Sequence, residues 1–225
     1  MILEQKGREI LRPSLEAIGK TLLYLGFSPT LVTLAGLILN IAAGVVLGFG
    51  YIQWGGIILL IAMPFDALDG TVARLSGRVS RFGTFWDATL DRFSEIAVFL
   101  GLIVYYSQSV GAHYIPLAVI ALTGSLMVSY TRARAESLGV ECKVGFAHRP
   151  ARMIIITIGF ILNQPVITIA VIAILANLTA FHRIFHTWQM TGGEDGGWAL
   201  PRDIYVPRGF DAHQSDEIEK PRVRI

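Results

Sequence analysis

The sequence predicts an all-α integral membrane protein in which six transmembrane helices follow an N-terminal amphipathic helix. Of its 225 residues, 53% are hydrophobic and only 16% are charged, whereas soluble domains carry about 25% charged residues. The hydrophobic residues fall into long blocks, most of them near the roughly 20 residues that a helix needs to cross the hydrocarbon. Lysine and arginine are missing from alternate connections between these blocks. Together these observations exclude an ordinary soluble enzyme.

The first predicted segment, residues 1–28, is an amphipathic juxtamembrane helix. Charged residues lie opposite four apolar residues that share one helical face: Leu11, Leu15, Ile18 and Leu22. Pro13 is expected to begin this helix or to kink it, because proline lacks the amide donor that a helix interior needs. Since a transmembrane span follows almost at once, we expect the helix to lie in the membrane interface rather than to bind a soluble partner.

The second predicted domain, residues 29–190, contains the six spans. A Ser-Pro pair at residues 28–29 is typical of a helix start, and a tight turn near residues 163–165 shortens the fifth span. The spans are predicted at residues 30–50, 53–75, 82–107, 113–138, 150–162 and 165–190. The remaining residues, 191–225, are polar and begin with several glycines, which predicts a flexible cytoplasmic tail.

The distribution of positive charge predicts the orientation. The connections near residues 48–51, 107–112 and 163–165 contain no lysine or arginine, while the other connections and the N-terminal segment collect these residues. Because positively charged loops stay in the cytoplasm, both termini are expected there. The sequence therefore predicts a multi-pass protein of the cytoplasmic membrane.

Four aspartates lie inside the second and third predicted spans: Asp66, Asp69, Asp87 and Asp91. One carboxylate at the centre of a span costs roughly 2.5–3.5 kcal/mol, and neighbouring carboxylates also repel one another. The first two are spaced i, i+3 and the last two i, i+4, so each pair shares one helical face. Because the connection between these spans is cytoplasmic, both pairs are expected at similar depth. The resulting oxygen cage suits Mg²⁺ or Mn²⁺ and has enough carboxylates for two ions.

Small residues and one arginine accompany these carboxylates in the pattern D-x-x-D-G-x-x-A-R and, eight residues later, G-x-x-x-D-x-x-x-D. Gly70 and Gly83 are expected to let a bulky ligand approach the helix backbone, and the Arg74 guanidinium can fork onto phosphate oxygens. Close packing between helices is the alternative for these glycines, and it is the favoured interpretation of Ala73 taken alone. The whole pattern predicts a divalent-metal site that holds a diphosphate on the cytoplasmic side.

This pattern, which runs from Asp66 to Asp91, resembles the signature of the CDP-alcohol phosphatidyltransferase family, and every fixed position is filled. The resemblance extends over about residues 28–190. It implies an Mg²⁺- or Mn²⁺-dependent enzyme, commonly a homodimer, that transfers a phosphatidyl group from a CDP-lipid to an alcohol and releases CMP.

The resemblance also implies roles for single residues. Asp66, Asp69 and Asp87 would bind metal, and Asp91 would bind metal as well or act as the general base on the acceptor hydroxyl. Arg92 is expected on a different helical face and is given no part in tuning this base. The CDP-lipid site would be lined by Asp69, Gly70, Ala73, Arg74 and Gly83.

Arginines also gather at the predicted cytoplasmic ends of the later spans, where their forked donors suit a phosphate monoester. The stretches over residues 129–136 and 148–150 are similar to the branch of the family that makes phosphatidylinositol phosphate. That similarity implies an acceptor-phosphate site made by Ser129, Arg132, Arg149 and Arg183. A purely topological role is the alternative for such arginines, and it is favoured for Arg134.

The predicted reaction is therefore transfer from a CDP-lipid to a phosphorylated polyol, with inositol phosphate as the preferred acceptor. An ether-lipid donor is equally compatible, and a phosphatidylglycerophosphate synthase that uses glycerol phosphate is the alternative within the family. The alternative outside it is a cation transporter with an acidic intramembrane site. A pore would carry acidic groups through the membrane depth, whereas these aspartates are confined to the predicted cytoplasmic half. The expected partners are the two substrates, the lipid bilayer and a second copy of the chain, without nucleic acid.

Overall fold

The structure, a computed structural model, describes residues 2–191, and all of its secondary structure over that range is helical. The α-helices in this range are α1 (Ile2–Tyr24), α2 (Pro29–Gly48), α3 (Ile52–Leu75), α4 (Arg81–Tyr105), α5 (Ile115–Ser137), α6 (Arg149–Ile161) and α7 (Pro165–Met190). A π-helical turn (Tyr106–Val110) and a 3₁₀ turn (Ala112–Tyr114) connect α4 to α5. The all-α prediction is confirmed for these residues. The predicted tail, residues 191–225, lies outside them apart from Thr191.

The starts of α2 and α4 follow from capping residues in the sequence. At α2, the Ser28 hydroxyl accepts a hydrogen bond from the Leu31 amide at 3.3 Å, and Pro29 takes the first helical position. At α4, the Ser80 hydroxyl accepts one from the Gly83 amide at 2.9 Å. These side chains satisfy amides that a helix end leaves unpaired. Both helices therefore begin close to the predicted bounds.

Two sequence-based expectations need correction. The third span was expected to end at residue 107, but α-helical geometry ends at Tyr105 and the chain continues as the π-helical turn. Pro13 does not begin α1, because the helix starts at Ile2 and runs through the proline. The helix continues through this position, although the proline ring removes one amide donor from it.

Within the described residues, four helical segments are long and apolar enough to cross a membrane: Pro29–Gly48, Ile52–Leu75, Ala112–Ser137 and Pro165–Met190. The chain is therefore a multi-pass membrane protein. The 25 residues of α4 are also long enough, but its charged residues lower its hydropathy. By contrast, α6 has only 13 residues. The count of six spans stays a prediction.

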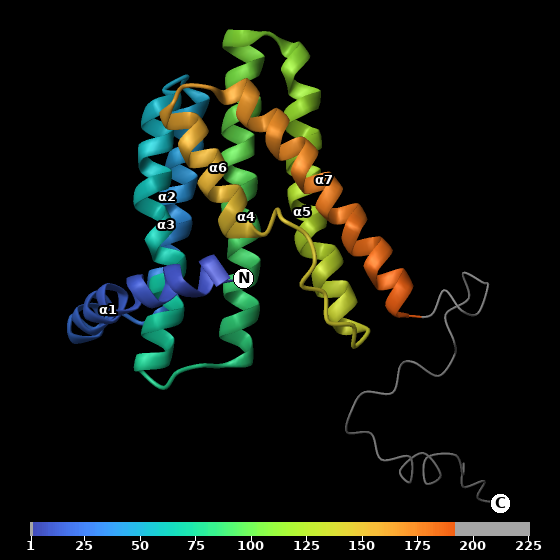
Figure 1. Cartoon of the computed structure of the whole chain (residues 1–225). Coiled ribbons are helices and arrows are strands. Elements are labelled where there is room, and N and C mark those ends of the chain that lie inside the picture. The colour runs from blue at the N-terminus through green and yellow to red at the C-terminus, as the bar shows by residue number, and fades with distance from the viewer. Residues whose placement is uncertain (1, 192–225) are drawn as a thin grey trace, which may run out of the picture.

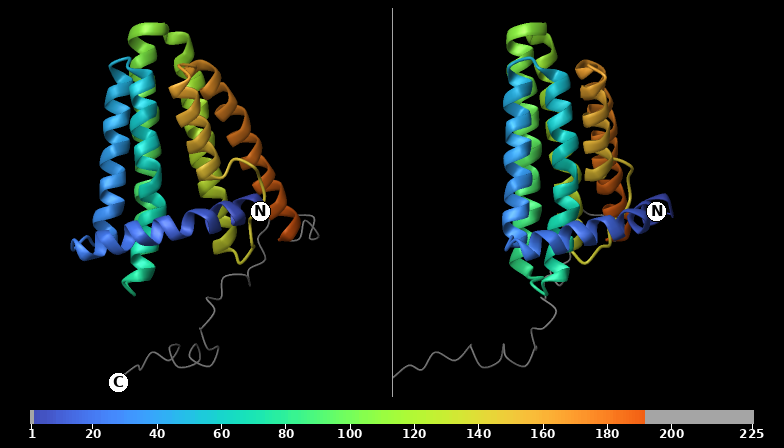
Figure 2. Two further views of the ribbon diagram at one scale, coloured as in Figure 1. Left: turned by 60° about the vertical axis from the view of Figure 1, so that its left-hand side comes forward. Right: turned by 90° about the vertical axis from the view of Figure 1, so that its left-hand side faces the viewer.

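Helices α2 to α7 form a closed ring (Figures 1 and 2). In this ring α2 packs against α3 and α4, α6 packs against α3 and α7, and α5 packs against α4 and α7. All six helices contribute to one buried apolar core, which includes Leu47, Phe99 and Phe160. The N-terminal helix α1 lies crosswise to the ring and packs on α3 (Figure 2).

The apolar face predicted for α1 is used in part to dock this helix on the ring. Leu15 and Leu22 pack against a small buried cluster that contains Leu68 and Val72 of α3. Ile18 is 47% exposed, so it remains free for contact with lipid. The interfacial position of α1 stays a prediction.

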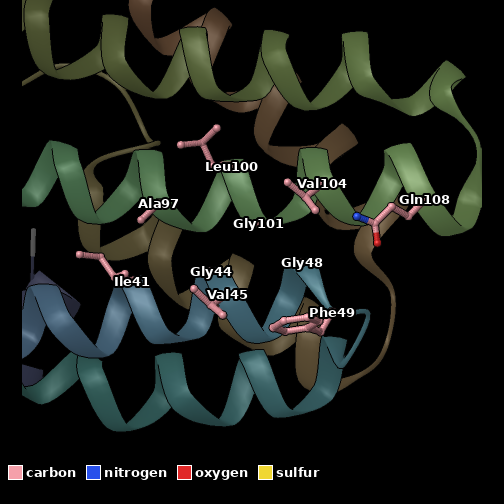
Figure 3. Close-up of a pocket in the computed structure, with 10 residues that line it drawn as sticks. All are labelled: Ile41, Gly44, Val45, Gly48, Phe49, Ala97, Leu100, Gly101, Val104 and Gln108. Atoms are coloured by element: carbon pink, nitrogen blue, oxygen red, sulfur yellow. The ribbon is translucent and has the colours of Figure 1, made fainter.

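The backbones of α2 and α4 approach each other closely at two glycines. A Cβ atom added to Gly101 would collide with the carbonyl oxygen of Gly44, the kind of contact that small residues permit between membrane helices. An apolar groove of about 410 Å³ lies beside this contact, and Gln108 stands at one end of it (Figure 3). Val45 and Leu100 of the lining are exposed. The groove therefore belongs to the apolar outer surface of the ring.

Candidate active site

The structure brings the two predicted aspartate pairs together, with an arginine of α6 among them. Arg149 Nη1 lies 2.6 Å from Asp66 Oδ2 on α3, and its Nη2 lies 2.9 Å from Asp91 Oδ1 on α4. Asp69 and Asp87 are close enough for direct electrostatic repulsion. The carboxylates of α3 and α4 thus share one region, as their spacing predicts.

Asp69 carries a carboxylate oxygen that calls for a cation. The residue is buried, with 6% of its surface exposed. Its Oδ1 accepts a hydrogen bond from the Gly70 amide at 2.5 Å, while Oδ2 is buried and has no hydrogen-bond partner within residues 2–191. A buried polar atom without a partner is costly. A bound cation would satisfy it.

A ready-made metal cluster is not found in the described part of the chain, where no three His, Cys, Asp or Glu side chains converge on one point. Two of the four predicted ligands, Asp66 and Asp91, are instead paired with Arg149. The donor set still suits a hard divalent ion, since all four predicted ligands offer carboxylate oxygens. The four-aspartate metal site stays a prediction.

A pocket of about 460 Å³ adjoins the aspartates. It lies between the starts of α2 and α4 and the end of α3. All five residues predicted for the CDP-lipid site line it: Asp69, Gly70, Ala73, Arg74 and Gly83. Asp87 lines it too, so the pocket and the carboxylates open into one space.

The pocket also has walls for which the motif gives no signal. Thr33 contributes from α2, and Phe82 and Trp86 contribute from the first turns of α4. The two aromatic rings stack, with centroids 5.9 Å apart and planes inclined by 25°. The only signal for Phe82 and Trp86 in the sequence is their position beside the motif residues Gly83 and Asp87. The start of α2 has no such link to the motif.

The motif glycines face open space rather than a neighbouring helix. A methyl group on Gly70 would meet only Arg74 Nη1, at 3.5 Å, and one on Gly83 would meet only Ser80 Oγ, at 3.0 Å. Gly101, by contrast, has a helix backbone in that place. Helix packing therefore does not explain Gly70, and this supports the ligand interpretation.

Gly70→Val is expected to raise the KM for CDP-lipid at least about tenfold, a loss of roughly 1.4 kcal/mol of binding. The branched side chain would enter the pocket without touching a neighbouring helix, so the melting temperature should stay within about 4 °C of the wild type. Ala67→Val, on an exposed position of the same helix, is the matched control. Equal KM values for both variants would contradict the assignment of the pocket.

The four residues predicted to bind the acceptor phosphate are engaged in separate contacts. Arg149 pairs with the aspartates, as described above. Arg183 is buried and donates to one backbone carbonyl of α5 and one of the loop before α6. Arg132 is exposed and its Nε lies 2.8 Å from Glu136 Oε1, while Ser129 is half-buried. Their joint role as phosphate ligands stays a prediction.

Two contacts near Asp91 were not expected. Arg92 was expected on a different helical face from Asp91, but its Nη1 lies 3.9 Å from Asp91 Oδ2. Its long side chain folds back along α4 and also donates to the Ala88 carbonyl. In addition, Glu95 forms a buried ion pair with Arg152 of α6. No role was predicted for that pair, because contacts between distant helices leave no local pattern in the sequence.

Comparison with known proteins identifies the family. Residues 27–188 match the family model described as CDP-alcohol phosphatidyltransferase. The chain belongs to this family. The matched range runs from the start of α2 almost to the end of α7 and so contains the pocket and all four aspartates. The prediction of a CDP-alcohol phosphatidyltransferase is therefore confirmed.

Similar members of the family are named as synthases of inositol phosphate lipids. An archaetidylinositol phosphate synthase of Pyrococcus horikoshii is 36% identical over 181 residues, which are 80% of this chain and 94% of that protein. A phosphatidylinositol phosphate synthase of Mycobacteroides abscessus is 35% identical over 159 residues, which are 70% of this chain and 72% of that protein.

Crystal structures of the phosphatidylinositol phosphate synthase of Mycobacterium tuberculosis share the fold at 30% identity. The structure with CDP-DAG bound has a TM-score of 0.72 and covers 77% of this chain and 93% of its own. The complex with manganese and citrate has a TM-score of 0.73 and covers 77% and 88%.

Proposed function

We propose that the protein transfers a phosphatidyl group, or its ether-lipid counterpart, from a CDP-lipid to a hydroxyl of inositol phosphate and releases CMP. The observation that carries this proposal is one pocket, which is lined by all five residues predicted for the CDP-lipid site and also by Asp87. Two findings on other proteins support it. Relatives at 36% and 35% identity are named as inositol phosphate lipid synthases, and a similar structure has CDP-DAG bound.

The four aspartates, Asp66, Asp69, Asp87 and Asp91, would hold two divalent ions, Mg²⁺ or Mn²⁺. The buried Oδ2 of Asp69, for which the described residues provide no hydrogen bond of good geometry, supports this. The manganese complex of the M. tuberculosis synthase supports it as well. When bound, such ions neutralise a diphosphate and stabilise the charge on the departing CMP.

The residues of the chain would bind the substrates and move the proton. Gly70 leaves space for the diphosphate beside the helix backbone, and the exposed Arg74 donates to its oxygens. Asp91 takes the proton of the acceptor hydroxyl. That oxygen forms a bond to the phosphorus that carries the lipid, and the bond from this phosphorus to CMP breaks.

For the acceptor phosphate, the proposed ligands are Ser129, Arg132, Arg149 and Arg183. Arg149 has the strongest support, because it contacts Asp91, where the acceptor hydroxyl must arrive. Arg183 lies within electrostatic range of Arg132. These guanidinium groups make the neighbourhood favourable for a phosphate monoester.

The acceptor is tested by measuring CMP release from CDP-diacylglycerol and from its ether-linked analogue. Inositol phosphate is expected to support a rate at least about tenfold higher than free inositol, since a hydrogen bond to a charged group contributes about 1.5–3 kcal/mol. A preference for free inositol would contradict the proposal. A preference for glycerol phosphate would select the phosphatidylglycerophosphate alternative.

Removal of divalent ions is expected to abolish turnover. Dialysis against EDTA should reduce CMP release by more than about a hundredfold, because the aspartates alone repel a diphosphate. Mg²⁺ or Mn²⁺ should restore the rate, and K⁺ at equal ionic strength serves as the control. Full activity in EDTA would refute the metal role of all four aspartates.

In the membrane, α2 to α7 would be the six spans, of which α6 would reach only part-way through the hydrocarbon, and α1 would lie in the cytoplasmic interface. Both termini and the active site would then face the cytoplasm, as the distribution of lysine and arginine favours. Residues 29–190 would form the catalytic domain, and two copies would associate as a homodimer.

A further inference from the structure

The interior of the ring contains a second ion pair that the proposed reaction does not use. Arg152 is 0% exposed and Glu95 is 1% exposed. Arg152 donates from Nε to Glu95 Oε1 at 2.9 Å and from Nη2 to Oε2 at 3.0 Å, and its Nη1 donates to the Ala147 carbonyl at 2.7 Å. All three guanidinium nitrogens and both carboxylate oxygens are thus hydrogen-bonded.

Stability alone is a weak reason for such a pair. Removing two charges from water costs several kcal/mol per ion, and replacing a buried pair by apolar residues is often neutral or stabilising. Removing one partner, however, leaves an uncompensated charge. The pair does fix the relative position of α4 and α6, because a forked arginine–carboxylate contact requires one arrangement of the two helices.

The Glu95–Arg152 pair lies next to the ion pair between Asp91 and Arg149. Glu95 follows Asp91 by one turn of α4, and Arg152 follows Arg149 by one turn of α6. Two consecutive ion pairs therefore join α4 to α6, Asp91 with Arg149 at 2.9 Å and Glu95 with Arg152 at 2.9 Å. The second is fully buried, while the side chains of Arg149 and Asp91 keep 16% and 15% of their surface exposed.

The same arginine helps to fix the chain that leads into α6. Ala147, which accepts from Arg152, donates its amide to Thr179 Oγ1 of α7 at 3.2 Å. One turn along α7, Arg183 donates to another carbonyl of this loop at 3.0 Å. Since Arg149 is the first residue of α6, these bonds fix the point from which its side chain reaches the aspartates.

We propose that Glu95 and Arg152 are positioning residues that hold Arg149 between Asp66 and Asp91. The inference rests on the proposed function, in which these aspartates bind metal and Arg149 meets the acceptor phosphate. Without the Glu95 charge, Arg152 would turn toward the carboxylate one turn away, Asp91. Without Arg152, Arg149 would turn toward the uncompensated Glu95. Either change moves Arg149 or its partners from their places.

Glu95→Gln, Arg152→Gln and the double variant test this positioning. Each single variant should raise the KM for inositol phosphate at least about tenfold, while the KM for CDP-lipid stays within about threefold. The Kd for Mn²⁺, measured by electron paramagnetic resonance on the purified protein, should shift in opposite directions. It should rise in Glu95→Gln, where a cation approaches Asp91, and fall in Arg152→Gln, where a cation leaves the aspartates.

The double variant restores a neutral, hydrogen-bonded contact. Its KM for inositol phosphate and its Kd for Mn²⁺ should both return toward the wild-type values. Glu141→Gln is the matched control, because it removes an exposed ion pair with Lys143 in the loop between α5 and α6. General structural damage would move the Mn²⁺ Kd of both single variants in the same direction. That result, or unchanged values in both, would overturn the inference.

Arg152→Lys decides the question if the single glutamine variants do not fold. Lysine keeps the charge, but an ammonium group cannot reproduce the fork on Glu95 together with the bond to Ala147. An acceptor KM at least about threefold above wild type supports the inference, and a wild-type KM overturns it. A wild-type protein that neither binds Mn²⁺ nor releases CMP would instead reject the proposed function itself.

Discussion

Asp91→Asn is expected to lower the rate of CMP release by about 10²–10⁴-fold, the contribution typical of a general base. Asparagine keeps the size of aspartate and can still accept the hydrogen bond from Arg149, whose Nη2 lies 2.9 Å from Asp91 Oδ1. It cannot take a proton from the acceptor hydroxyl, and its amide is a weaker metal ligand than a carboxylate. Initial rates at saturating CDP-lipid and inositol phosphate measure the effect.

Glu141→Gln, which removes one exposed carboxylate outside the pocket, is the control for this variant and should keep the wild-type rate. An equal elution volume in detergent would show that the Asp91→Asn protein is still folded. If it retained more than about half of the wild-type rate, Asp91 could not be the base. Cation flux through liposomes carrying the wild-type protein would favour the transporter instead.

Gly101→Ala is expected to destabilise the ring by roughly 3 kcal/mol, the upper end of the cost of overpacking. The added methyl would meet the Gly44 carbonyl, and a helix backbone cannot rotate away as a side chain can. The two helices would have to separate and open their contact. The melting temperature in detergent and the midpoint of unfolding by dodecyl sulfate report this change.

Gly48→Ala, on the α2 side of the same contact, is the matched control. A methyl there would lie 3.5 Å from Val104 Cγ1, an ordinary contact distance. Because alanine favours a helix over glycine, and Gly48 is the last residue of α2, this variant should be at least as stable as the wild type. Equal stability of the two variants would contradict the close approach at Gly101.

Features with a local signal were predictable from the sequence. The helix start at α2 follows from Ser28 and Pro29, whose capping contacts are made within three residues. The shared face of Asp66 and Asp69 follows from helical spacing alone. Five residues of the pocket lining follow from the motif, which keeps four of them within about two turns of α3 and places Gly83 in the first turn of α4.

Features that depend on the closure of the ring were not predictable. Arg149 was predicted to bind the acceptor phosphate. In the structure its guanidinium lies between two carboxylates that are distant in sequence. Arg183 was assigned the same role, but it is buried and donates to backbone carbonyls. Glu95 was not singled out at all. In each case at least one partner is supplied by a helix that is not adjacent along the chain.

The shortness of α6 has a consequence for how the two substrates meet. Its 13 residues span about 20 Å, against a hydrocarbon thickness of about 30 Å, and its Arg149 end stops part-way along α4 (Figure 1). In the proposed orientation, Arg149 and the aspartates that it contacts would therefore lie deeper in the membrane than the cytoplasmic ends of α3 and α4. The proposed sugar-phosphate acceptor would then have to pass below the headgroups to reach them, whereas the lipid donor could reach them from within its own leaflet.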